Sequence, residues 1–229
     1  MDNVSSSDKK KTKIHNIVPF SFMVVYSIMM TTATITLIEA LRTNNIGVRH
    51  VMNLETCISI VAGYYYSIFI TKVNDTTKQV DWIEITKLRY IDWSITTPLM
   101  LITLCLVLAK NSKQLIHFTT LFSIIILNYI MLGIGYYGVS NPQYKLFTML
   151  GGFIPFLAMF YLIYVNYYGN NIANKVLFNL YFVVWGMYGI VYMFPEIPKN
   201  VCMNILDLIA KCFIGIGLWI YYSKIIDKF

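Results

Sequence analysis

Charged side chains are scarce in this sequence, because only 13% of its 229 residues are Asp, Glu, Lys or Arg. Soluble domains carry about 25% charged residues, so this chain has too few charges to cover a water-facing surface. Its residues are 57% hydrophobic and 16% aromatic, which excludes a disordered chain as well. The formal net charge of +7 does not indicate nucleic acid, because the basic residues lie between apolar runs. Soluble enzymes, coiled coils and nucleic-acid-binding domains are therefore excluded, and a polytopic membrane protein remains.

Cysteine motifs are missing too. Cys57, Cys105, Cys202 and Cys212 lie in apolar stretches, and none has the short paired spacing of a zinc or redox site. We expect them to be small buried hydrophobic residues, and we expect no metal site. No linker, repeat or low-complexity segment interrupts the chain. Its composition predicts a polar, basic N-terminal tail over residues 1–16 and one transmembrane domain over residues 17–229.

Long apolar runs, in contrast, are abundant. A bilayer core about 30 Å thick requires about 20 apolar residues in a helix. The sequence predicts seven such spans: Ile17–Leu41, Val51–Thr71, Glu84–Ala109, Leu115–Tyr137, Tyr144–Tyr168, Lys175–Phe194 and Val201–Ile226. The connections are short, and the longest of them, Lys72–Ile83, predicts a small hairpin. The expected fold is an all-α, multi-pass bundle of seven helices, an integral membrane protein surrounded by lipid.

The orientation of this bundle follows less directly from the sequence. Lys and Arg residues in the loops weakly favour an N-terminus outside the membrane, whereas the four lysines of the N-terminal tail favour the reverse. We adopt the N-terminus outside as the expectation.

Five ionisable residues lie deep inside the predicted spans: Glu55, Arg89, Asp92, Asp207 and Lys211. Such a residue costs at least about 2.5–3.5 kcal/mol on insertion scales, so it indicates a functional site. Arg89 and Asp92 are three residues apart, and Asp207 and Lys211 are four apart, so each pair shares a helix face. Two buried salt bridges for stability alone would be an inefficient choice. A lysine beside carboxylates in an apolar pocket is instead suited to a Schiff base.

These residues carry a resemblance to a known family. Residues 206–211, Leu-Asp-Leu-Ile-Ala-Lys, resemble the seventh-helix signature of microbial (type 1) rhodopsins. Residues 89–99, Arg-Tyr-Ile-Asp-Trp-Ser-Ile-Thr-Thr-Pro-Leu, are similar to the family's third helix. Trp-Gly-Met-Tyr at 185–188 is similar to the family's sixth helix, and span four has Asn128, Met131, Gly133 and Gly135 at the family's spacing. The resemblance covers all seven spans, and the short loops are similar to the viral branch of the family. Two departures concern pocket shape: Gly189 replaces a frequent proline, and Tyr192 replaces a tryptophan.

The resemblance implies a cofactor, all-trans retinal, held as a protonated Schiff base on Lys211. It implies Asp92 and Asp207 as counter-ions, Arg89 beneath them, and Thr96 hydrogen-bonded to Asp92. It also implies a chromophore pocket, for which the expected lining residues are Trp93, Thr97, Met100, Asn128, Met131, Trp185, Tyr188 and Tyr192. Thr97 and Asn128 are expected to bond across the third and fourth spans.

The resemblance leaves the transport mode open. An acceptor carboxylate, Asp92, is present, but Thr103 stands where a proton pump of the best-known kind has its donor. Glu55 is a candidate substitute donor, with a lipid-interface glutamate as the alternative interpretation. Lys199 replaces the family's proton-release carboxylate, and Glu196 is a candidate to compensate for it.

A polar stripe on the seventh span favours a second mechanism. Asn200, Asn204, Asp207 and Lys211 follow each other at steps of four, three and four residues. Such a stripe can line a cation pathway of a light-gated channel, or it can be a hydrogen-bonded release network within a pump. The favoured prediction is a light-driven outward proton pump, followed by a light-gated cation channel and then a sensory photoreceptor. The expected partners are retinal, lipid, and protons or other cations, without nucleic acid. Homo-oligomers are common in the family and are implied here by analogy only.

Overall fold

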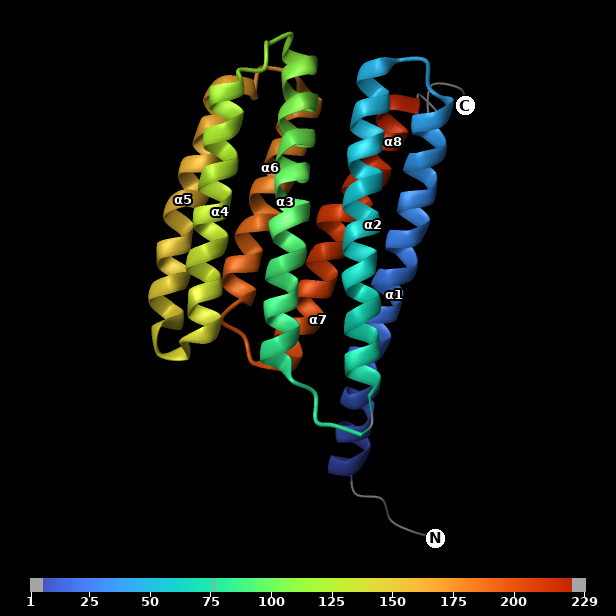
Figure 1. The fold of residues 1–229 in the computed structure, drawn as a ribbon, viewed down its shortest axis with the longest axis vertical. Coiled ribbons are helices and arrows are strands. Elements are labelled where there is room, and N and C mark those ends of the chain that lie inside the picture. Colours follow the sequence, from blue (N-terminus) through green and yellow to red (C-terminus); the bar gives the residue numbers. More distant parts are fainter. Residues whose placement is uncertain (1–5, 76, 224–229) are drawn as a thin grey trace.

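The computed structural model describes residues 6–75 and 77–223, with side chains from residue 17 onward. It is all-helical, and no strand forms within the described ranges. The first six helices of the bundle are α1 (Ser6–Arg42), α2 (Ile46–Asn74), α3 (Trp82–Ser112), α4 (Phe118–Ser140), α5 (Lys145–Tyr167) and α6 (Ile172–Val191). A short 3-10 turn, η1 (Pro142–Tyr144), precedes α5. The seventh helix is built from α7 (Glu196–Asp207), the π-helical segment η2 (Leu208–Phe213) and α8 (Ile214–Ser223) without a break. The prediction of a seven-helix bundle is confirmed (Figure 1).

Two details differ from the expectation. The first helix begins at Ser6, not at Ile17, so the helix includes part of the predicted polar tail. The predicted hairpin between the second and third spans is wrong, because α2 continues to Asn74 and α3 begins at Trp82. Between them, the side chain of Asp75 accepts hydrogen bonds from the backbone and hydroxyl of Thr77. These bonds lower the pKa of the Asp75 carboxyl, and they favour a turn over a strand.

Six of the seven helices are long and apolar enough to cross a membrane. The exception is α6, where Asn174, Lys175 and Asn179 lower the mean hydropathy. Large apolar side chains such as Phe147, Ile154 and Tyr161 on α5 point outward and are more than half exposed. An outward apolar surface of this kind matches a lipid environment. The protein is therefore an integral, multi-pass membrane protein.

The helices divide the bundle into two sides with α3 between them. In Figure 1, α1 and α2 lie beside the α7–α8 column, and α4 and α5 lie on the opposite side. One buried apolar cluster joins α3, α5 and α6 and includes Leu101, Phe160 and Trp185. A smaller cluster lies between α1 and α2 and includes Phe22 and Phe69. Because residues of the seventh helix belong to both clusters, its central charged residues Asp207 and Lys211 are buried.

The cysteines follow the prediction only in part. Cys105 and Cys212 are buried, whereas Cys202 is half-buried and Cys57 is exposed. The expectation of burial was wrong for Cys57, because an apolar side chain on an outward helix face can contact lipid as readily as the protein interior. All four thiols are free.

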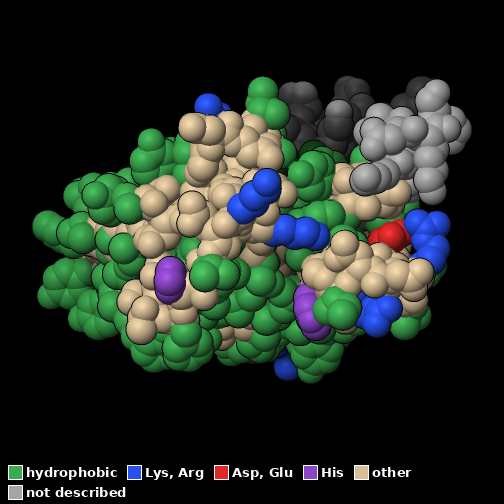
Figure 2. All heavy atoms as spheres, turned by 90° about the horizontal axis from the view of Figure 1, so that it is seen from above, with side chains coloured by type: hydrophobic (Ala, Val, Ile, Leu, Met, Phe, Trp, Pro, Cys, Tyr) green, Lys and Arg blue, Asp and Glu red, His purple; other side chains and the backbone are tan. Residues whose placement is uncertain are grey.

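Basic side chains gather at one end of the bundle. Figure 2 views the end at which α1 finishes and α2 begins, and it shows Lys and Arg side chains over this face. The described basic residues of these loops and helix ends are Arg42, Arg49, Lys110, Lys113 and Lys175. We call this end the basic end and the other end, where α3 and α7 begin, the tail end.

Candidate functional site

Lys211 occupies the centre of the bundle. It lies in η2, and its Nζ donates a hydrogen bond of 2.6 Å to Asp92 Oδ2 on α3. Asp207 Oδ1 lies 3.8 Å from the same nitrogen. The three residues are at most 2% exposed. The pairing predicted from the sequence spacing is therefore present, with one amine held between two carboxylates.

Arg89 completes the charge cluster on the tail-end side. Its Nη1 lies 3.1 Å from Asp207 Oδ2, and its Nη2 donates to Asn204 Oδ1. Its guanidinium lies 5.0–5.5 Å from the ring centroids of Phe22, Tyr66 and Phe69. Two cations and two carboxylates therefore form a set whose formal charges cancel. A buried set of this kind is stable only if its members stay together.

Tyrosine hydroxyls hold Asp207 in place. Tyr66 on α2 donates to Asp207 Oδ2 at 2.8 Å, and Tyr188 on α6 donates to Asp207 Oδ1 at 2.7 Å. Asp207 therefore accepts hydrogen bonds on both oxygens. In contrast, Asp92 Oδ1 has no hydrogen-bond partner among the described residues. The carboxylate with spare acceptor capacity is the one that directly contacts Lys211.

The predicted polar stripe is hydrogen-bonded only in part, because Asn200 Oδ1 has no partner among the described residues. Asn204 donates from Nδ2 to the hydroxyl of Ser21 at 2.8 Å, while its Oδ1 accepts from Arg89. Asn200 is fully buried and donates to the backbone of Glu196 at 2.9 Å. Lys199 is 5% exposed and forms a 2.7 Å salt bridge with Glu196. The stripe thus ends at an ion pair near the tail end.

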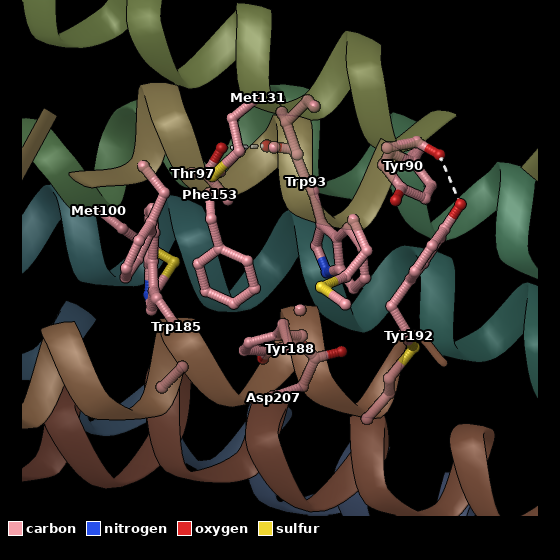
Figure 3. Close-up of a pocket in the computed structure, with 18 of the residues that line it drawn as sticks. Tyr90, Trp93, Thr97, Met100, Met131, Phe153, Trp185, Tyr188, Tyr192 and Asp207 are labelled. Carbon is pink, nitrogen blue, oxygen red and sulfur yellow. Dashed lines mark hydrogen bonds between the residues drawn. The ribbon is translucent and has the colours of Figure 1, made fainter. Parts of the chain in front are cut away.

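A mostly apolar cavity opens from Lys211 between α3 and helices α4–α6. Figure 3 shows the rings of Trp93, Phe153 and Trp185 turned into it. Seven of the eight predicted pocket residues line the cavity: Trp93, Thr97, Met100, Met131, Trp185, Tyr188 and Tyr192. The described chain therefore brings the third, fourth and sixth spans together around the lysine as the sequence suggested.

Asn128 and Thr96 depart from their expected positions. Asn128 does not line the cavity but lies behind it, where its Nδ2 donates to Thr97 Oγ1 at 2.8 Å. The expected bond between α3 and α4 is thus present. The hydroxyl of Thr96 donates to the backbone carbonyl of Asp92 at 2.9 Å, so the expected bond to the carboxylate is absent. A threonine within a helix readily bonds the carbonyl four residues earlier, and here that local bond prevails.

On the basic-end side of Lys211, Glu55 is the last of the five deep ionisable residues, and it lies apart from the charge cluster. Glu55 on α2 is 1% exposed, and its Oε1 has no hydrogen-bond partner in the described structure. It does not reach the lipid interface, so the alternative of an interfacial glutamate is wrong. Thr103 on α3 is also fully buried, and its hydroxyl has no partner among the residues described.

Sequence reasoning missed several residues that the structure brings into the site. Tyr66 donates a hydrogen bond to Asp207, and the hydroxyl of Ser21 accepts one from Asn204. Phe153 lines the cavity. Ser21 and Tyr66 are polar-tipped residues within apolar spans, which is a weak signal shared by many tyrosines of this chain. Only the packing of α1 and α2 against the seventh helix shows that Ser21 and Tyr66, among the similar residues of the chain, belong to the site.

The residues present fit retinal. A long apolar ligand attached to Lys211 would extend between Trp93 and Trp185, and the cavity contains little polar surface to bind water. Gly189 contributes to the shape, because a Cβ there would lie 2.6 Å from the ring of Phe153. The free Oδ1 of Asp92 leaves an acceptor next to the nitrogen. Lysine, acceptor and apolar slot are the components that a retinal site requires.

Comparisons with known proteins agree with this geometry. The family model for bacteriorhodopsin-like proteins matches residues 1–225. The chain is 29% identical over 157 residues to bacteriorhodopsin of Halobacterium salinarum, and that match covers 60% of this chain and 56% of the relative. The chain thus spans just over half the length of this curated relative.

Solved structures match more completely. The viral rhodopsin OLPVRII is 42% identical, with a TM-score of 0.85, and the match covers 91% of this chain and 98% of that one. Xanthorhodopsin, described as a light-driven ion pump with dual chromophore, is 20% identical with a TM-score of 0.76, over 90% of this chain and 92% of that one. The similarity to xanthorhodopsin shows the fold alone.

Proposed function

This chain belongs to the bacteriorhodopsin-like family, and from that membership we propose that it is a retinal-binding, light-driven outward proton pump. The observation that carries the proposal is the 2.6 Å contact between Lys211 Nζ and Asp92 Oδ2, in a site closed to water. A proton on that nitrogen has an acceptor at hydrogen-bond distance, which is the first requirement for proton transfer.

Lys211 would hold the cofactor, and the aromatic residues of the cavity would orient it. Bound as a Schiff base, retinal supplies visible-light absorption and a bond whose isomerisation changes the direction in which the nitrogen points. Trp93 and Trp185 restrict the space on α3 and α6, and both are buried. A slot of this kind permits motion about few bonds and excludes bulk water.

Asp92 accepts the proton. No described residue bonds its Oδ1, whereas both oxygens of Asp207 accept hydrogen bonds from tyrosines. Asp207 remains an ionised partner of Arg89 throughout, because its removal from that pair would leave a buried cation uncompensated. The two acids therefore have different roles, although they belong to one cluster.

The route outward follows the tail-end network. Arg89, Asn204 and Ser21 form a hydrogen-bonded series from Asp207 to α1. The ion pair of Lys199 and Glu196 lies where the polar stripe ends. We assign the final release to Glu196, whose side chain is 41% exposed. In this proposal, the tail end and the N-terminus face outward.

The route inward depends on Glu55. No described cation forms a salt bridge with this carboxyl, and a lone buried carboxylate would neutralise by binding a proton. Glu55 therefore holds a proton at rest and donates it to the nitrogen of Lys211 after Asp92 has been protonated.

The second candidate function, a light-gated cation channel, rests on the polar stripe. In this structure, the guanidinium of Arg89 lies between Asp207 and Asn204 and is packed against three aromatic rings. A metal cation on this path would meet a fixed positive charge, whereas a proton can move along the hydrogen bonds. The position of Arg89 therefore favours the pump.

Liposomes that contain the retinal-loaded protein distinguish the two functions. A pump acidifies or alkalises the lumen under light when the starting pH is equal on both sides, and the change collapses on addition of a protonophore. A channel produces no change from equal pH and only dissipates a gradient that was imposed. Light-induced current through a channel would reverse at the equilibrium potential of the conducted ion, and this result would overturn the proposal.

A further inference from the structure

A glycine of the seventh helix faces the lone acid of α2. Gly215 lies in α8, four residues after Lys211, which is about 6 Å along a helix axis. An alanine Cβ at this position would lie 2.9 Å from Glu55 Oε2 and 3.2 Å from Thr32 Cγ2. The carboxyl of Glu55 therefore occupies the space that a side chain at position 215 would fill.

The contact belongs to an enclosed environment. Glu55 and Thr32 are at most 1% exposed, and Gly215 is buried. The hydroxyl of Thr32 is directed to the backbone of Ile28 at 2.9 Å, so its methyl group faces the glycine. The carboxyl thus rests against a methyl group and a bare backbone; no described cation pairs with it, and its Oε1 has no hydrogen-bond partner among the described residues. Shape alone positions it.

We propose that Gly215 is a positioning residue for Glu55, and that its missing side chain lets the carboxyl approach the helix turn that carries Lys211. This inference rests on the proposed role of Glu55 as proton donor. The transfer moves one proton from the Glu55 carboxyl to the nitrogen of Lys211, and it leaves a carboxylate that recovers its proton from the basic-end side. The rate of this step depends on the distance and alignment of the two groups.

The variant Gly215→Ala tests the proposal. The atom that must move is the end of a flexible side chain, so the backbone can stay in place while the carboxyl is displaced. We expect reprotonation of the Lys211 nitrogen after a flash to slow about tenfold or more. We also expect the carbonyl stretch of the protonated Glu55 side chain to shift in infrared spectra of the dark protein, with and without retinal.

The chain offers a matched control in Gly217, two residues further along α8. A Cβ at Gly217 would meet nothing within 4 Å. Both glycine-to-alanine changes gain the same helix propensity, so a general effect on the helix would appear in both variants. Gly217→Ala should leave the reprotonation rate and the Glu55 carbonyl stretch unchanged.

A shorter acid provides a second variant. In Gly215→Ala combined with Glu55→Asp, the shorter side chain withdraws the carboxyl from the added methyl group, so this variant should fold even if Gly215→Ala does not. Because the carboxyl is then further from the turn that carries Lys211, reprotonation should stay slow. Reprotonation at the wild-type rate in the double variant would show that close approach to position 215 is not needed, and it would overturn the proposal.

The outcomes separate this inference from the proposed function. Glu55→Gln should slow reprotonation about tenfold or more, and an unchanged rate would remove Glu55 as donor and the inference with it. If Glu55→Gln is slow but Gly215→Ala behaves like Gly217→Ala, the donor role stands and the positioning role of Gly215 is wrong.

Discussion

Deep in the bundle, the polar groups on the two sides of Lys211 differ in how they are paired, whereas nearer the basic end Glu39 forms a salt bridge with Arg42. Toward the tail end, Arg89, Asp207, Asn204 and Tyr66 form a network in which the charged groups have partners. Toward the basic end, Glu55 Oε1 and the hydroxyls of Ser59 and Thr103 have no hydrogen-bond partner among the described residues. All of these residues lie within the same membrane-spanning bundle.

The difference matters for proton movement. A network of paired charges keeps its members ionised and in fixed positions, because separation of any pair exposes a charge to a medium of low dielectric constant. A lone acid in the same medium remains neutral, because nothing stabilises its carboxylate. The paired side can therefore hold the counter-ions of a cation, and the sparse side can store a proton.

Removal of the acceptor charge should have the largest effect. Asp92→Asn leaves the nitrogen of Lys211 without its nearest carboxylate, so light-driven pH changes in liposomes should fall about a hundredfold or more. The absorption band should shift to the red, because a negative counter-ion is lost. Asp75→Asn makes the same chemical change in the loop after α2, and both readouts should remain at wild-type values. An unaltered colour in Asp92→Asn would assign the main counter-ion to another group.

The second-largest effect is expected from removal of the Arg89 guanidinium. Arg89→Ala leaves Asp207 without its arginine partner, and loss of one partner of a buried pair costs about 3–5 kcal/mol of the free energy of unfolding. Arg49→Ala, at an exposed arginine on the basic end, should cost little. The free energy of unfolding of both variants can be measured by titration with SDS, with loss of the visible absorption band as the readout. Equal losses in the two variants would contradict the claim that the tail-end network depends on paired charge.

The smallest effect is expected on the sparse side. Thr103→Val removes a buried hydroxyl that has no partner in the described structure, so stability should stay the same or rise by about 1 kcal/mol. Thr97→Val makes the same change at a hydroxyl that donates to Trp93 and accepts from Asn128, so it should cost about 1–3 kcal/mol. A marked loss of stability or slower reprotonation in Thr103→Val would show that Thr103 does have a function.

Much of this arrangement could be predicted from the sequence. Charges are rare in apolar spans, so Arg89, Asp92, Asp207 and Lys211 were conspicuous, and spacings of three and four fixed their shared faces. Lysine and acid motifs on two helices also specified the family. The long apolar runs predicted the seven spans, with errors at their ends. The first helix extends into polar sequence and begins at Ser6, and the second begins at Ile46, where Asn45 caps it.

The sequence could not predict which residues of different helices are in contact. The bond from Tyr66 to Asp207 and the contact of Gly215 with Glu55 join residues distant in the chain, and neither residue stands out in composition. The Thr96 hydroxyl could bond either a carboxylate or a backbone carbonyl, and spacing does not distinguish them. Rotation and packing of the helices decide all three.

The central claim is that the amine of Lys211 carries the chromophore, and absorption spectroscopy tests it most directly. The purified protein, its Lys211→Ala variant and its Lys199→Ala variant each receive all-trans retinal. Lys199 is the other buried lysine of the seventh helix, so its replacement controls for loss of a buried amine. The account predicts a visible band for the wild type and Lys199→Ala, and only the absorption of free retinal for Lys211→Ala. A visible pigment in Lys211→Ala, or a colourless wild type, would contradict it.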